Sequence, residues 1–142
     1  MSPALKFLIG LALVAAMGWI HHGLLGTGER LIGNLENQAK MVVAKTEVPG
    51  VEVRLGYDPL SRLATFSGNA DPFQREGQGE LKGLNDRVRD IDGISGVRWT
   101  DEADKTAIPL FLEVLAQLVA AYLIGLGIAW LLFGRARRES FY

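Results

Sequence analysis

Two apolar segments at opposite ends of the chain constrain its fold more than any other feature. The first runs from Phe7 to about Leu25 and the second from Ile108 to Phe133. Residues 114–133 carry no formal charge, and as a helix they would be about 30 Å long, which matches the hydrocarbon core of a bilayer. We therefore expect a membrane protein with transmembrane helices over residues 5–25 and 108–133. The polar middle of the chain would lie outside the bilayer.

The first apolar segment also has features of a signal peptide. Lys6 precedes it, and Ala15 and Ala16 are small enough for a signal peptidase to accept nearby. We expect the segment to be retained, as an uncleaved signal anchor.

The distribution of charge predicts the topology. Arg135, Arg137 and Arg138 directly follow the second apolar segment, in a basic tail over residues 134–142. Basic residues beside a span favour the cytoplasmic side. Residues 27–107 hold eleven basic and fourteen acidic side chains, a net charge of −3. We expect both termini in the cytoplasm of a bacterial cell, the spans in the inner membrane and the middle domain in the periplasm.

Composition excludes several classes of function. The 142 residues include no cysteine, so disulfides, thiolate metal sites and thiol nucleophiles are ruled out. The net charge of −1 argues against nucleic acid as a partner, because phosphate binding needs a concentrated basic surface. No serine, histidine and carboxylate pattern predicts catalysis. We expect a protein that is not an enzyme and that has no cofactor and no metal.

A stripe of small and polar residues recurs every four positions along the second apolar segment, so its members would share one side of a helix. Ala121, Gly125 and Ala129 form its lower half, and their small-xxx-small spacing lets helix backbones approach closely. Glu113 and Gln117 form its upper half and offer a carboxyl and an amide for hydrogen bonds. This pattern predicts a helix–helix interface with integral membrane protein subunits. The 113–129 stripe consists of Glu113, Gln117, Ala121, Gly125 and Ala129.

His21 and His22 lie at the outer end of the first apolar segment. Imidazole binds metals and the magnesium of pigments, so both are possible ligands. Neighbouring helical residues point about 100° apart, which makes a shared ion difficult. A polar helix end lying among lipid headgroups explains the pair equally simply.

The middle segment has the periodicity of a small α+β domain. An amphipathic helix is predicted over residues 29–47, with Ile32 and Val43 beside an apolar face that consists of Leu31, Leu35, Ala39, Val42 and Thr46. Strands follow at residues 51–55 and 62–67, on either side of a turn at residues 57–60. Asp71, Pro72 and Gln74 mark the start of a second helix, which the apolar spacing extends to Ile91. Val97 and Trp99 define a third strand, which completes the order α-β-β-α-β.

Short motifs in this segment resemble the BON domain family. They are Val51-Glu-Val-Arg-Leu, Ala64-Thr-Phe-Ser-Gly68 and Val88-Arg-Asp-Ile-Asp-Gly-Ile-Ser-Gly-Val97. The resemblance covers residues 29–100 and implies a BON-like periplasmic domain, over about residues 29–103, between the two transmembrane helices. It also implies attachment to phospholipid or protein surfaces without catalysis.

Three functional hypotheses follow. The first is an accessory or scaffolding subunit of a bacterial membrane protein complex, docked through the second span. The alternative is a stand-alone envelope protein that binds lipid through the BON-like domain, with Trp99 or the glycine-rich second helix at the surface. The third is a subunit of an energy-transducing complex that ligates a cofactor or pigment through His21 or His22.

Overall fold

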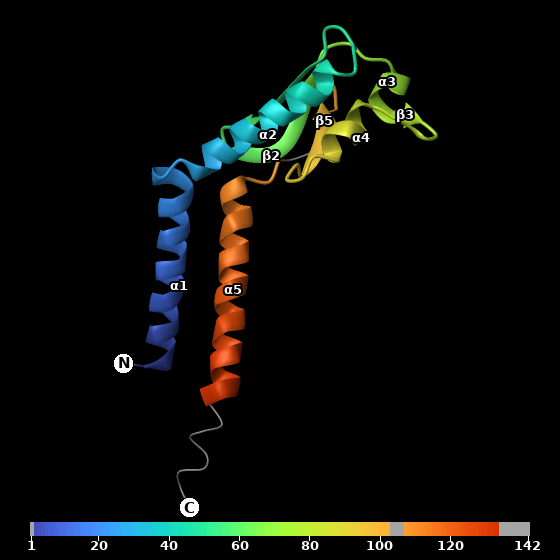
Figure 1. The fold of residues 1–142 in the computed structure, drawn as a ribbon. Helices are drawn as coiled ribbons and strands as arrows, with labels where there is room; N and C mark the ends of the chain where they lie inside the picture. The colour runs from blue at the N-terminus through green and yellow to red at the C-terminus, as the bar shows by residue number, and fades with distance from the viewer. Residues whose placement is uncertain (1, 103–106, 134–142) are drawn as a thin grey trace, which may run out of the picture. The chain divides into compact units, whose positions relative to one another are not determined.

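The computed structural model describes residues 2–102 and 107–133 (Figure 1). Within these residues the chain combines helices and strands, with two apolar helices towards its ends. It divides into two compact units. The helical unit contains the two ends of the chain, up to Leu25 and from Phe111 onwards, and the α/β unit is Gly26–Leu110.

The helical unit is a pair of long helices that run side by side (Figure 1). The first is α1 (Pro3–Trp19), extended by a π-helical turn, η1 (Ile20–Leu24). The second is α5 (Leu110–Phe133). In the described part of the chain these two helices are long and apolar enough to cross a membrane, and almost none of their span residues is buried. An apolar surface of this kind is suited to lipid, which makes the chain consistent with a membrane protein.

The α/β unit begins with α2 (Thr27–Ala44), close to the predicted helix over residues 29–47. Its buried side chains follow the helical repeat: Ile32, Leu35, Ala39 and Val43. Leu35 and Ala39 of the predicted face are buried, whereas Leu31 is 43% exposed and the neighbouring Ile32 is fully buried.

Within the described residues, β1 (Glu52–Tyr57), β2 (Leu60–Ser67) and β5 (Gly96–Trp99) form a three-stranded sheet in the order β1-β2-β5. β1 and β2 are antiparallel, and β2 and β5 are parallel. The register aligns the buried side chains on one face, which α2 and α4 (Leu84–Arg89) cover. The predicted strand alternation is therefore confirmed. The aligned residues are Val53, Leu55, Ala64, Phe66, Val97 and Trp99.

The predicted single helix from Asp71 to Ile91 is wrong. The segment forms α3 (Pro72–Glu76), a short hairpin of β3 (Gly77–Gln78) and β4 (Leu81–Lys82), and then α4. Gly77 has φ of 78°, and a Cβ on it would lie 2.0 Å from the carbonyl oxygen of Leu81. The chain therefore folds back on itself where the apolar spacing had indicated a continuous helix. The predicted start is confirmed, because Asp71 and Gln74 form a reciprocal capping box.

Candidate functional site

One side of α5 contacts α1. The Tyr122 hydroxyl donates to the carbonyl oxygen of Phe7 at 3.2 Å, and the two rings lie 5.8 Å apart. The absence of side chains at Gly10 and Gly18 makes room for Tyr122 and Leu118, since a Cβ at Gly10 would lie 2.1 Å from the tyrosine oxygen. The helices thus meet through an aromatic hydrogen bond and the small surface of two glycines, and Tyr122 is the residue that the sequence did not single out.

The 113–129 stripe lies on another side of α5. Gln117 and Ala121 each precede a residue of the α1-facing side, so they are rotated from it by about 100°. Gln117, Ala121, Gly125 and Ala129 are exposed, and Glu113 is half-buried. A Cβ on Gly125 would meet nothing within 4 Å. α1 thus leaves the stripe from Gln117 to Ala129 exposed. The interface with another subunit remains a prediction.

The two histidines occupy the π-helical turn η1. His21 is exposed, and the His22 ring is half-buried with its centroid 5.6 Å from that of Phe111 at the start of α5. This contact gives His22 a packing role within the helical unit. Neither histidine belongs to a group of three His, Cys, Asp or Glu side chains that could hold a metal, and no such group occurs anywhere in residues 2–102 and 107–133. Arg135, Arg137 and Arg138 lie outside the described residues.

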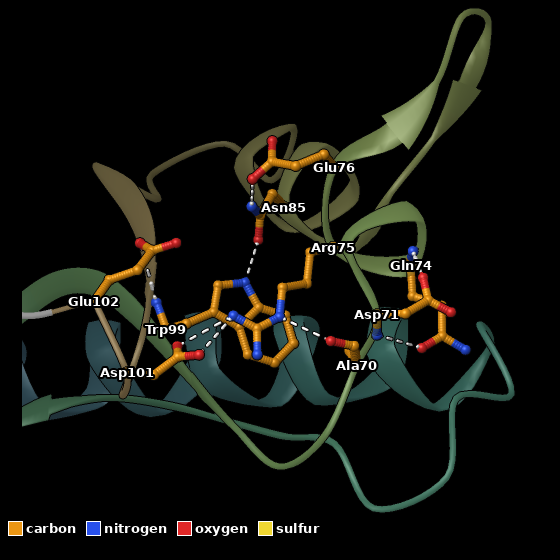
Figure 2. Close-up of polar contacts among 9 residues, drawn as sticks. All are labelled: Ala70, Asp71, Gln74, Arg75, Glu76, Asn85, Trp99, Asp101 and Glu102. Atoms are coloured by element: carbon orange, nitrogen blue, oxygen red, sulfur yellow. Dashed lines mark hydrogen bonds and ion pairs between the residues drawn. The ribbon is translucent and has the colours of Figure 1, made fainter.

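A polar cluster surrounds Trp99 in the α/β unit (Figure 2). The indole N–H donates to Asn85 Oδ1 at 2.9 Å, and Asn85 Nδ2 donates to Glu76 Oε1 at 2.8 Å. The Arg75 guanidinium lies 4.0 Å from the centre of the indole ring and forms two hydrogen bonds with Asp101. The cluster therefore ties α3, α4 and the end of β5 together.

The tryptophan at the centre of this cluster is buried. Trp99 is 1% exposed and stacks on Phe66 with ring centroids 4.8 Å apart. In the described residues, every buried side-chain nitrogen and oxygen atom has a hydrogen-bond partner. Such a satisfied network favours a single packing of the core around Trp99. The hypothesis that Trp99 contacts lipid is wrong, because the core encloses its ring.

A groove of about 820 Å³ lies between α2 and β1. Five consecutive residues, 51–55, line it, so both faces of the strand contribute and the groove must follow the strand's edge. From the other side it is lined by residues of α2, among them Glu36, Lys40, Val43 and Ala44. β1 is an outer strand of its sheet, which makes this groove the open edge of the α/β unit.

The Glu36 side chain occupies part of this open edge. Its carboxylate accepts a hydrogen bond from the Leu55 N–H at 3.0 Å and pairs with Lys40 one turn further along α2. Burial opposes ionisation of Glu36 more than any other single influence. The hydrogen bonds from Lys40 and Leu55, with the charges of Lys40 and Arg54, together outweigh it and lower the pKa of the carboxyl. The i,i+4 spacing of Glu36 and Lys40 was visible in the sequence, whereas the Leu55 contact depends on the fold.

Comparison of the chain with protein-family models, curated proteins and solved structures finds no match.

Proposed function

We propose that this chain is a non-catalytic accessory subunit of a bacterial membrane protein complex. Its two long helices anchor it in the inner membrane, with both termini in the cytoplasm. The α/β unit, with its BON-like sequence motifs, covers a periplasmic surface of the complex. The partners are integral membrane protein subunits.

The observation that carries this proposal is the exposed lower part of the 113–129 stripe. Within lipid there is little hydrophobic drive between helices, so close packing and interhelical hydrogen bonds must supply association. Ala121, Gly125 and Ala129 allow close backbone approach, and Gln117 can hydrogen-bond on the same side. α1 contacts Tyr122 and Leu118 instead, which leaves the exposed residues Gln117, Ala121, Gly125 and Ala129 available to a further helix.

The test compares two glycines of α5 that differ only in direction. Gly125 belongs to the stripe, and Gly127 lies about 200° further around the helix. Both have open space at the Cβ position. We expect Gly125→Ile to abolish co-purification of partner subunits with the tagged full-length chain, and Gly127→Ile to leave their yield unchanged. Quantitative mass spectrometry of the detergent-solubilised complex measures both yields. Equal yields for the two variants would show that the stripe does not dock.

Binding of phospholipid by the α/β unit is the second candidate. It is favoured by two exposed apolar side chains, Phe73 at 49% and Leu81 at 65%, on α3 and β4. The net charge of −3 over residues 27–107 opposes attraction to anionic lipid. If the isolated segment 26–110 floats with liposomes and the double change Phe73→Ser and Leu81→Ser releases it, this candidate replaces the first. Sedimentation of the unmodified segment away from liposomes at low salt removes it.

A further inference from the structure

The groove between α2 and β1 exposes a main-chain edge. Leu55 donates its N–H to Glu36 and therefore points it away from β2. In an antiparallel pair, alternate residues direct both main-chain groups towards the same edge. Val53 consequently directs its N–H and C=O into the groove as well. A free strand edge is complementary to one kind of partner, another extended main chain.

We propose that this groove binds an extended segment of a partner protein, which adds to the sheet as a strand beside β1. The run of lining residues 51–55 extends over about 13 Å at 3.3 Å per residue, so the bound segment is about five residues long. This inference concerns the α/β unit alone. It goes beyond docking through α5 and does not depend on it.

Charges along β1 define the chemistry of the segment. Glu52 and Arg54 project from the face of the sheet opposite to Val53 and are highly exposed, with a 3.2 Å ion pair between them. An antiparallel strand centred on Val53 would place one residue opposite each of them. The complementary sequence is acidic, then apolar, then basic, with the apolar side chain on the α2 side. Val43 and Ala44 of α2 line the groove there.

A second copy of this chain carries the sequence Glu52-Val53-Arg54 but fits the groove poorly as a folded unit. Strands in a sheet are about 4.8 Å apart, whereas packed helices need 8–10 Å between their axes. α2 packs against β1, and its Glu36 side chain reaches the outer edge of that strand. Pairing two copies through β1 would bring two α2 helices too close together. A segment without a covering helix avoids this conflict.

The probe is a synthetic peptide with the sequence of residues 49–57, which supplies the acidic-apolar-basic order without α2. Full-length protein in nanodiscs is titrated against the fluorescent peptide, and anisotropy measures binding. We expect saturable binding. N-methylation of the peptide's central valine, whose N–H would bond to Val53, should weaken it about tenfold, because one intermolecular hydrogen bond is lost. N-methylation of the adjacent arginine, whose N–H points away, should have little effect.

Variants of the protein test the pairing register of the peptide and the role of Glu36. Arg54→Glu should weaken binding of this peptide and strengthen binding of a peptide with glutamate replaced by arginine. Glu36→Ala should tighten binding several-fold, because it frees the Leu55 N–H. Lys40→Ala leaves that contact in place and serves as the matched control. Arg54 is exposed on a strand, so its change should not unfold the unit.

Three results would overturn the proposal. The first is no peptide binding at millimolar concentration. The second is binding that tolerates methylation of the central valine, since a strand addition cannot. The third is a disulfide between full-length chains carrying Glu52→Cys and Arg54→Cys separately, formed only when the two are mixed. That result would identify a second copy as the occupant.

Discussion

Asn85 connects the buried indole of Trp99 to Glu76 and is itself only 5% exposed. Its amide has both an acceptor and a donor, which is why one side chain can satisfy a buried N–H and a carboxylate together. Arg75 adds a cation over the ring and an ion pair to Asp101. These residues are scattered in sequence, so no spacing rule predicts their meeting.

Replacing Asn85 by leucine should destabilise the α/β unit by about 1–3 kcal/mol, because the Trp99 N–H would remain buried without an acceptor. Urea unfolding followed by near-ultraviolet circular dichroism measures the loss. Glu76→Gln keeps an oxygen acceptor for the Asn85 amide and should cost much less. A stability of Asn85→Leu equal to that of the unmodified chain would contradict the role assigned to the indole hydrogen bond.

Glu36 makes the stability of the α/β unit depend on pH. Because folding lowers the pKa of Glu36 below its ordinary value of 4.5, its contribution is present above that value and is lost as the pH falls through the lower, folded-state pKa. The stability difference between the unmodified chain and Glu36→Gln should therefore shrink in acid. Denaturant titrations from pH 7 downwards test this. A difference that is constant across that range would show that the carboxylate charge does not matter.

Among the elements, the segment from α3 to α4 departs furthest from its sequence pattern. Phe73 and Leu81 matched a helical apolar repeat with Leu84 and Val88, yet the first two are exposed and the last two are buried. Apolar spacing alone cannot distinguish a continuous helix from two short helices around a turn. The glycines at 77, 79 and 83 were the signal for the break, because glycine has a low helix propensity and Gly77 and Gly79 adopt positive φ.

Gly77→Ala should destabilise the hairpin between α3 and α4 by more than 1 kcal/mol. The new methyl group would adopt an unfavourable positive φ and overlap the Leu81 carbonyl. Gly79→Ala is the matched control, because Gly79 also has positive φ but has open space around its Cβ position. Amide hydrogen exchange of β3 and β4 reports on both variants. Equal protection in the two would mean that the close contact adds nothing to the backbone strain.

The strands and long helices were more predictable than their contacts. Alternation at Val53, Phe66 and Trp99 correctly indicated one buried sheet face, because the side-chain period of a strand is fixed by geometry. The stripe on α5 could be recognised from its four-residue spacing. The side of α5 that contacts α1 could not be recognised in the same way. The Tyr122 hydroxyl and Gly10 are far apart in sequence and come together only because α5 packs against α1.

At the scale of the whole molecule, the core of the α/β unit is built from its own elements. Its largest fully buried side chains come from α2, the sheet and α4. We expect the segment 26–110 to fold without the two long helices and to unfold cooperatively in urea, because its buried apolar surface is internal. Near-ultraviolet signals of the segment, in which Trp99 is the one tryptophan, should match those of a full-length chain that carries Trp19→Phe and Trp130→Phe. A segment with helical but no tertiary signals would show that the unit needs the anchors.

The parallel pairing of β2 with β5 also determines the order in which the chain can assemble. β1 and β2 are joined by a tight turn and can meet as soon as residue 67 has been synthesised, whereas β5 must return across the whole segment that contains α3 and α4. Closing this longer loop is slower and costs more entropy. The strand made last thus completes the core. A polypeptide that stopped before residue 96 would contain both strands of the first hairpin, but the ring of Phe66 would have no Trp99 to stack on.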